Sequence, residues 1–267
     1  MTFFSIGSGS SGNCYCLSSD NHSCLMIDCG LGMRAIKKAF HDRGIPLTDI
    51  RAILVTHAHA DHVKSVGSLC QQLLVPVYAT RNTHQGIYHN HYVHRKIPGN
   101  LIQTIDEGAT FQVDDFRITS FAIPHDCVGH VGYTIEIAGT VFTIVTDCGH
   151  PTDIIRHHIM RSHYLVLEAN YDLDMLLHGR YPYRLKTRIQ GDMGHLDNTV
   201  AAQLLAESAT PQLRHVWLCH LSQENNTPEQ ALHTVTTCLR SHGIVAGKDF
   251  LLDALERKQP SRAYEIV

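Results

Sequence analysis

The chain has 267 residues, of which 43% are hydrophobic, and a formal net charge of −3 at pH 7. This length and composition allow one α/β domain with a sizeable core, and we expect a single domain over residues 1–267. The charge excludes a global basic field of the kind that marks many nucleic-acid-binding proteins, so any DNA contact must come from a local patch. No apolar run approaches the roughly 18 residues of a membrane helix.

The first third of the chain alternates short apolar runs with helical patterns. These patterns predict strands over 3–6, 13–17, 24–27 and 50–55, and helices over 33–41, ended by Gly44, and 63–74. The first run lacks the charged start and long apolar stretch of a secretion signal, so we expect it to be the first strand of a cytoplasmic protein. Nine cysteines, an odd number at irregular spacings, argue against a disulfide framework and fit a reducing compartment.

The strand at 50–55 runs into the segment THAHADH, residues 56–62. Such a cluster arises by chance in roughly 1% of chains of this composition, which favours a metal site over a solvated turn. Residues two apart in an extended segment point the same way, so His57 and His59 can share an ion. Asp61 opens the next helix, where a carboxylate suits the N-terminal dipole, and His62 points elsewhere. Imidazole with carboxylate suits Zn, Mn or Fe better than Ca or Mg.

Three later apolar runs also end in residues that can ligate a metal. Strands predicted over 116–123, 141–145 and 215–218 run into His125, Asp147 and His220, respectively. Strands that deliver ligands from their ends to one rim of a sheet build a rigid site. We therefore expect these three residues to supply the ligands that the first motif lacks.

The remaining patterns complete an α/β arrangement of two mixed sheets covered by helices. Further strands are expected over 110–113, 133–137 and 165–167, with Ala138 and Gly139 as a tight hairpin turn. Further helices are expected over 152–160, 198–208 and 227–241. The last of these has a good start signal, with Thr227 as its cap and proline at the first helical position.

The order of the ligand-type residues resembles the metallo-β-lactamase superfamily. The resemblance covers nearly the whole chain and implies a four-layer αββα sandwich with two divalent metal ions, Zn or Mn, with Fe as an alternative. It implies that the first ion is bound by His57, His59 and His125. The second is then bound by Asp61, His62 and His220, and Asp147 bridges the two ions.

Further motifs resemble the YycJ/WalJ (VicX) branch of this superfamily. They are SGSSGN at 8–13, DCG at 147–149, LEAN at 167–170, KxRI at 186–189, GHLxN at 194–198 and HLSxxN at 220–225. Members of the branch are described as 5′-to-3′ DNA exonucleases and are often labelled as relatives of phosphoribosyl cyclic phosphodiesterases. The chain departs from the branch at Cys148, where small or hydroxyl residues are usual, and at Asp197, where serine is usual. Neither departure touches a predicted ligand.

The expected chemistry needs no side-chain nucleophile. Two neighbouring metal ions lower the pKa of a bridging water, so that hydroxide attacks phosphorus while the ions stabilise the developing charge. The serine-rich loop at 8–11 lacks the context of a hydrolase elbow. Asp61 and His195 are the expected catalytic residues. His195 is the candidate proton donor to the leaving oxygen, with a phosphate-binding or structural role as the alternative.

Substrate contacts are expected from Asn13, Asn170, Arg184, Lys186, Arg188 and Asn225. The basic run from Arg180 to Arg188 is interleaved with Tyr181 and Tyr183, which suits a phosphate backbone with stacked bases, or else a solvated surface. The histidine-rich segment 81–96 is a candidate lid over the metals, a second basic face or an exposed surface.

The leading hypothesis is a dinuclear metal-dependent phosphodiesterase, a 5′-to-3′ exonuclease with DNA as its substrate and no membrane partner. The alternatives are a small-molecule cyclic phosphodiesterase of the phosphoribosyl cyclic phosphate type and a metal-binding regulatory module. The sequence makes no prediction of the oligomeric state.

Overall fold

The computed structural model describes residues 1–267 and groups them into two compact units. Unit 1 comprises Met1–Ser120, Cys127–Val131 and Glu256–Val267, and unit 2 comprises Phe121–Asp126 and Gly132–Leu255. The histidine motif at 56–62 lies in unit 1, whereas His125, Asp147 and His220 lie in unit 2. The single domain expected over residues 1–267 stays a prediction.

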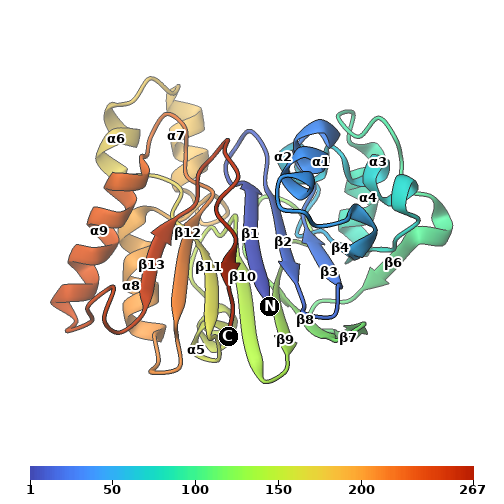
Figure 1. Ribbon diagram of the computed structural model, residues 1–267. Helices are drawn as coiled ribbons and strands as arrows, with labels where there is room; N and C mark the ends of the chain where they lie inside the picture. The colour runs from blue at the N-terminus through green and yellow to red at the C-terminus, as the bar shows by residue number, and fades with distance from the viewer. The chain divides into compact units, whose positions relative to one another are not determined.

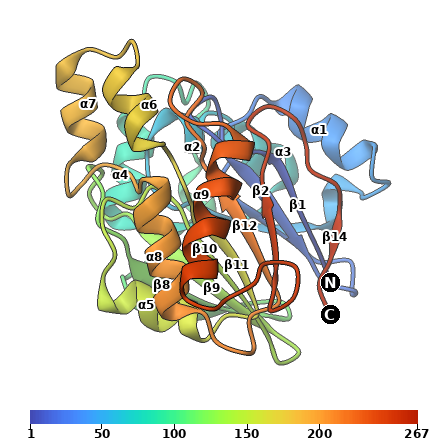
Figure 2. The same cartoon turned by 90° about the vertical axis from the view of Figure 1, so that its left-hand side faces the viewer.

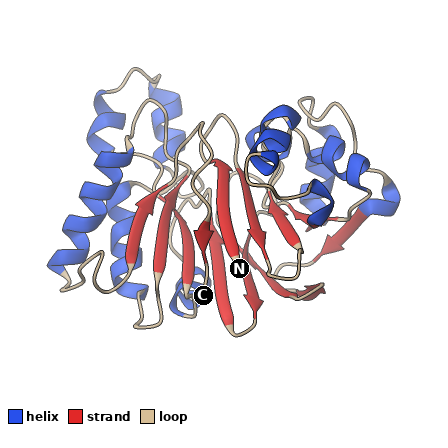
Figure 3. Ribbon diagram, viewed as in Figure 1, coloured by secondary structure: helices blue, strands red, loops and turns tan.

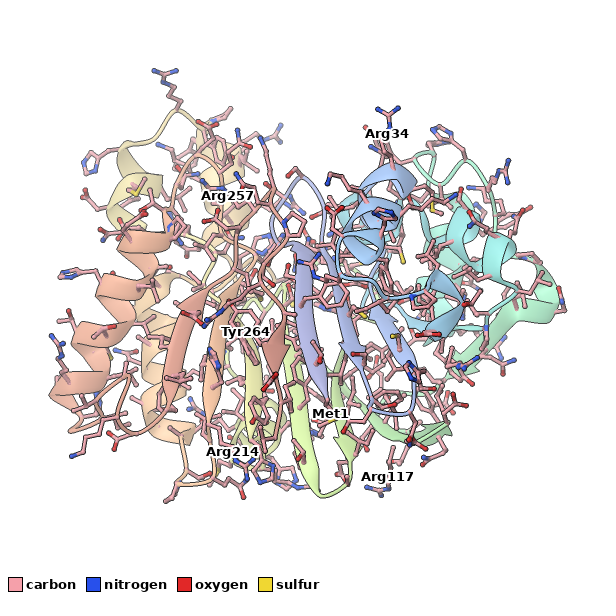
Figure 4. The ribbon with its side chains drawn as sticks, in the orientation of Figure 1. Met1, Arg34, Arg117, Arg214, Arg257 and Tyr264 are labelled. Carbon is pink, nitrogen blue, oxygen red and sulfur yellow. The ribbon has the colours of Figure 1, made fainter.

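Unit 1 contains a seven-stranded mixed sheet with the strand order β14-β1-β2-β3-β4-β5-β6 (Figure 1, Figure 3). Its strands are β1 (Thr2–Gly7), β2 (Cys14–Ser18), β3 (Cys24–Ile27), β4 (Ile50–Leu54), β5 (Val77–Thr80), β6 (Ile102–Ile105) and β14 (Tyr264–Glu265). β1, β2 and β3 are antiparallel neighbours, whereas β3 to β6 run parallel. The two chain ends meet in this sheet, because Phe3 of β1 pairs with Tyr264 of β14 (Figure 4).

The helices of unit 1 are α1 (Met33–His41), α2 (Ala60–Val63), α3 (Val66–Leu73) and α4 (Arg81–His89), with short 3-10 turns at Leu47–Asp49 and Gly99–Leu101. α1 is amphipathic and buries Ile36, Ala39 and Phe40 in the core, where the Phe40 ring packs edge-on against Phe4 at 5.6 Å. The single helix predicted over 63–74 is wrong. It is broken at Ser65, whose backbone N–H donates to the Cys29 carbonyl at 2.8 Å instead of continuing the helix.

The second sheet is also seven-stranded and mixed, with the order β13-β12-β11-β10-β9-β8-β7. Its strands are β7 (Thr110–Val113), β8 (Phe116–Ala122), β9 (Val131–Ile137), β10 (Thr140–Val145), β11 (Tyr164–Glu168), β12 (His215–Cys219) and β13 (Leu251–Ala254). β10 to β13 run parallel, so their carboxyl ends meet at one edge. The predicted hairpin between β9 and β10 is confirmed, since Ala138 and Gly139 both have the positive φ that its tight turn requires.

Five helices belong to unit 2: α5 (Asp153–Met160), α6 (Leu173–His178), α7 (Tyr183–Gln190), α8 (Asn198–Ser208) and α9 (Pro228–Ser241). Figure 2 shows α8 and α9 side by side along the sheet. α8 contributes Ala201, Leu204 and Leu205 to the core, where they join Leu167 of β11 and Leu218 of β12. No helix in the chain has the length and apolar character needed to cross a membrane.

The expected α/β class with two mixed sheets is confirmed. Apart from the broken helix, every predicted element is present, with its ends shifted by at most two residues. The patterns did not predict β5, β6, β13 and β14 or the helices α4, α6 and α7.

Candidate metal centre

The histidine motif of unit 1 follows strand β4 and ends in the short helix α2. His57 and His62 are buried, and His59 is the N-cap residue of α2. The ring centroid of His57 lies 4.7 Å from that of His59 and 4.1 Å from that of His62. The loop thus gathers three imidazoles, with Asp61 in the first turn of α2. A further buried imidazole that the sequence analysis missed, His130, has its ring centroid 4.5 Å from that of His57.

A buried carboxylate at the end of strand β3 orients this loop. Asp28 is fully buried and accepts hydrogen bonds from the backbone N–H and the hydroxyl of Thr56, each at 2.9 Å. Its Oδ2 lies 2.7 Å from Nδ1 of His62. Because a carboxylate only accepts, His62 carries its proton on Nδ1, which leaves the Nε2 lone pair for a metal ion. The sequence analysis missed Asp28, although it ends an apolar run as the predicted ligands do.

Asn13, a predicted substrate contact, is buried beside the acidic end of the motif. Its Nδ2 lies 3.3 Å from Oδ2 of Asp61 and 2.9 Å from Nε2 of His62. An amide nitrogen only donates, so the second contact also requires a proton-free Nε2 on His62. The close approach of the two loops depends on Gly30, where an added Cβ would lie 1.6 Å from the Asp61 carbonyl oxygen. Asn13 is therefore placed to position Asp61 and His62, and its contact with a substrate stays a prediction.

Unit 2 holds a second cluster at the carboxyl ends of its parallel strands. Asp147 follows β10, Glu168 ends β11 and His220 follows β12, which is where such sheets place ligand-binding residues. The ligand atoms of these three residues and of His195 lie within 4.8 Å of one another. Asp147 and His220 have the left-handed backbone φ values 55° and 53°. Such strained backbone is kept mainly where the surrounding structure fixes it, as at functional sites.

Glu168 is the centre of this second cluster, and the sequence analysis did not assign it a role. Its carboxylate is fully buried and lies 2.8 Å from Nδ1 of His195 and 2.9 Å from Nδ1 of His220. It also accepts the backbone N–H groups of Cys148 at 2.7 Å and Leu196 at 3.2 Å. Burial alone would raise the pKa of the Glu168 carboxyl, but the charge and hydrogen bonds of the two histidines lower it below its usual value. The sequence signal for Glu168 was its position as an acidic residue at the end of the apolar run 164–167.

His125 is held by the loop that carries His195. Its Nδ1 lies 3.0 Å from the carbonyl oxygen of Gly194, so Nδ1 carries the proton and Nε2 faces Asp147, whose Oδ1 is 3.9 Å away. Burial lowers the pKa of His125 and so favours the neutral imidazole that a metal ion requires.

The donor atoms of both clusters fit a divalent metal ion of the zinc type. Each cluster combines buried imidazoles with carboxylates, and His62, His125 and His220 each have Nδ1 beside a carboxylate or carbonyl oxygen. This outer contact fixes the ring and leaves Nε2 as the ligand atom, as is usual for metal-binding histidines.

The predicted substrate contacts fall into two groups. Asn170 and Asn225 are buried, and Asn170 donates to the backbone carbonyl of His220 at 2.7 Å, so it supports the His220 loop. On α7, Lys186 donates to the Leu177 carbonyl at 2.7 Å and Arg188 pairs with Asp126. Arg184, also on α7, is exposed and forms no ion pair. None of these placements tests contact with a substrate.

The histidine-rich segment 81–96 begins as α4, in which His84 is buried with its Nε2 3.1 Å from the Gln103 carbonyl oxygen. The other histidines of this segment are exposed, and its role as a lid stays a prediction.

Residues 24–220 match the profile of the beta-lactamase superfamily domain. The chain belongs to this superfamily. Within the superfamily it is 32% identical over 262 residues to exodeoxyribonuclease YycJ of Bacillus anthracis, covering 98% of both chains. It is 31% identical over 245 residues to exodeoxyribonuclease WalJ of Streptococcus pneumoniae, covering 92% of this chain and 90% of that one. The predicted YycJ/WalJ-like branch is therefore confirmed.

Two solved structures share the fold of this chain. YhfI from Bacillus subtilis, a metallo-beta-lactamase fold protein, covers 97% of this chain with a TM-score of 0.70 at 17% identity, over 98% of its own length. Zn²⁺-bound PqqB from Methylobacterium extorquens covers all of both chains with a TM-score of 0.72 at 16% identity. These likenesses confirm the predicted α/β sandwich, and membership of the superfamily confirms the prediction of a metal-dependent hydrolase.

Proposed function

We propose that this chain is a dinuclear metal-dependent phosphodiesterase that degrades DNA as a 5′-to-3′ exonuclease. The observation that carries the proposal is the cluster of Asp147, Glu168 and His220, all buried, with the partly buried His195, in a chain similar over almost its whole length to exodeoxyribonuclease YycJ. The donor set supports metal ions, and the relatives support DNA as the substrate.

We propose that His57, His59 and His125 bind one ion, that Asp61, His62 and His220 bind the other, and that Asp147 bridges them. When bound, two such ions would supply a water deprotonated near neutral pH and a Lewis acid for the phosphate oxygens. Asp28 and Glu168 would hold the histidine rings with Nε2 toward the metal.

His195 is the proposed proton donor to the leaving oxygen. Its side chain is 14% exposed, whereas His220 on the same carboxylate is 3% exposed, so His195 is the more accessible of the two. Glu168 accepts the Nδ1–H of His195 at 2.8 Å and fixes the orientation of the ring, so Nε2 is the atom from which His195 would donate a proton.

A first experiment tests the function itself. The purified chain, loaded with Mn²⁺ or Zn²⁺, is incubated with DNA labelled at the 5′ or the 3′ end. We expect metal-dependent release of nucleotides from the 5′ end. A metal-loaded protein that cleaves no DNA would contradict the proposal. Cleavage of a chromogenic phosphodiester that DNA does not inhibit would instead favour a small-molecule cyclic phosphodiesterase.

A second experiment tests the proton donor. His195→Ala is assayed on phosphodiesters with good and poor leaving groups. General acid catalysis contributes about 10²–10⁴-fold, and a good leaving group does not need it. We therefore expect a large loss on the poor leaving group and a small one on the good leaving group. An equal loss on both would rule out the acid role.

A further inference from the structure

Helices α6 and α7 lie side by side at the edge of unit 2 (Figure 1, Figure 2). Residues of both helices line a surface groove. The groove has a volume of about 500 Å³ and is lined by Leu177, Tyr183, Lys186, Thr187, Gln190 and Gly191. This volume lies within the roughly 300–1,000 Å³ range of small-molecule sites, large enough for a nucleobase with its sugar. None of these residues belongs to the metal-ligand clusters.

The groove exposes apolar and aromatic side chains. Tyr183 is 82% exposed and Leu177 is 51% exposed, and both side chains line the groove. Scattered exposed apolar residues are ordinary, but a ring and a leucine that line one groove provide a flat apolar surface for a ligand. An aromatic face of this kind is what unpaired bases stack on in proteins that bind single strands.

The segment that forms the groove carries an excess of positive charge. Residues 173–191 contain four arginine or lysine side chains and one acidic side chain, Asp174, which already lies 3.1 Å from His178. Arg180 and Arg184 are exposed and form no ion pair, so their charges are available to phosphate groups. The chain as a whole is acidic, so the positive charge of α6 and α7 is a local excess.

The carboxyl end of α7 is joined directly to the loop that carries His195. The backbone N–H of His195 donates to the Ile189 carbonyl at 3.0 Å, and that of Gly194 donates to the Gly191 carbonyl at 2.7 Å. A Cβ added at Gly194 would lie 2.1 Å from the Ile189 oxygen, so this approach needs glycine. The carboxyl end of α7 is therefore hydrogen-bonded to the loop that contributes His195 to the second cluster.

From this arrangement we infer that the α6–α7 groove binds single-stranded DNA, with Tyr183 stacked on an unpaired base and Arg180 and Arg184 contacting its phosphates. The inference rests on the proposed function and specifies the form of the substrate. Eight residues of α7 span about 12 Å, and stacked nucleotides rise about 3.4 Å each. Tyr183, at the end of α7 away from the His195 loop, then stacks on a base several nucleotides from the cleaved phosphate.

The experiment compares a long and a short substrate. A single strand of about twelve nucleotides and a chromogenic nucleotide diester are hydrolysed by wild-type chain, Tyr183→Ala and Tyr183→Phe. Stacking of one base predicts that Tyr183→Ala lowers kcat/KM for the strand about tenfold relative to kcat/KM for the diester. Tyr183→Phe keeps the ring and is expected to retain the wild-type ratio.

The charge contribution is measured from the salt dependence of binding. Each phosphate contact to a single strand changes the slope of log K against log salt by about 0.7. Arg184→Gln is therefore expected to reduce the slope by about that amount, whereas Lys248→Ala, at an exposed lysine in the loop after α9, serves as the charge control.

Two results would overturn the inference. One is an unchanged ratio in Tyr183→Ala, and the other is an equal fall in Tyr183→Ala and Tyr183→Phe. The groove as a DNA-binding site and the exonuclease function can be tested separately. Fluorescence anisotropy measures the binding of a labelled strand in the presence of a chelator, where no metal-dependent cleavage occurs. A wild-type chain that binds the strand through Tyr183 but cleaves no DNA would remove the exonuclease function and leave the groove as a binding site.

Discussion

Two buried carboxylates perform the same task for the histidines beside them. Asp28 contacts Nδ1 of His62 in unit 1, and Glu168 contacts Nδ1 of His195 and His220 in unit 2. Asp28 and Glu168 thereby fix the ring protons of His62 and His220 on Nδ1 and leave the Nε2 lone pairs of these two rings for a metal ion. The metal-binding form of each cluster is therefore set by residues that are not themselves among the predicted ligands.

Asp28→Asn tests this task directly. Asparagine keeps the size of the side chain and tolerates the φ of 60° at this position. Its amide N–H would face Nδ1 of His62, which would move the ring proton to Nε2 and block the metal. We expect metal affinity and activity to fall about 10- to 100-fold, measured by competition with a chromogenic chelator and by hydrolysis. Asp114→Asn, at a φ of 46° in the β7–β8 turn, is the matched control. Equal affinities in the two variants would contradict this role for Asp28.

The positions of the ligand-type residues could be predicted from the sequence. Asp28 and Glu168 also end apolar runs, but the contacts through which they support the histidines could not be predicted. His125, Asp147 and His220 were predicted because each follows an apolar run. Glu168 and Asp28 act through contacts between segments 27 to 52 residues apart, which no local spacing encodes. The roles of Asn170 and Asn225 depend on burial, which a polar side chain in a loop motif does not reveal.

At the scale of elements, Asp197 explains one departure from the branch pattern. It is the N-cap of α8, and its side chain accepts the backbone N–H groups of Thr199 at 2.6 Å and Val200 at 3.0 Å. Serine, which the branch usually has there, caps helices about equally well, so the exchange preserves the element.

Removing this cap should destabilise the chain without affecting the chemistry. Asp197→Ala is expected to lower the free energy of unfolding by about 1 kcal/mol, whereas Asp197→Ser changes it by only a few tenths. Urea unfolding measures the difference. A stability of the serine variant as low as that of the alanine variant would show that the cap is not what Asp197 contributes.

The helices that the patterns missed are short. α6 has six residues and α7 has eight, below the roughly 12–15 residues at which an isolated helix becomes marginally stable. They depend on a small cluster in which Leu176 and Ile189 pack with Tyr171. Such packing joins residues distant in sequence, so the periodicity of a six-residue segment cannot predict it. The missed strands β5, β6, β13 and β14 have at most four residues each.

At the scale of the whole molecule, His158 of α5 makes stability depend on pH. Its ring stacks on Phe121 with a centroid distance of 4.0 Å, and its Nδ1 lies 2.8 Å from the Thr134 hydroxyl. Burial, with smaller contributions from His157 and Arg161, lowers the pKa of His158 from 6.5 to about 4.

Between these two pKa values the unfolded chain binds a proton that the folded chain does not. Stability is therefore lost as the pH falls from 6.5 to 4, by up to about 3 kcal/mol. His158→Gln removes this contribution, and we expect its urea midpoint to fall less than that of the wild-type chain over this range. His157→Gln, at the exposed neighbour, is the control. A wild-type pH dependence in His158→Gln would contradict the assignment.

Metal ions should also control the stability of the whole molecule, because the second cluster holds two acidic side chains away from water. Asp147 is 2% exposed and Glu168 fully buried, and both approach the same two histidines. A divalent cation offsets this charge, and binding to the folded chain alone adds about 2.7 kcal/mol at a metal concentration of 100 Kd. For a chain of this size that corresponds to about 5–10 °C in Tm.

The substitution Asp147→Asn should change Tm relative to the wild-type chain in opposite directions in metal-loaded and metal-free protein. With metal, the variant loses a ligand and melts below the wild-type chain. In a chelator, it replaces one of the two neighbouring buried carboxylates, Asp147 and Glu168, with a neutral amide and so removes their repulsion, and it is expected to melt at or above the wild-type temperature. Asp115→Asn, at an exposed position, should change neither value. Thermal unfolding of the three chains, with bound metal measured beside it, provides the comparison. A wild-type Tm that metal does not raise would show that the clusters contribute no metal site to the folded chain.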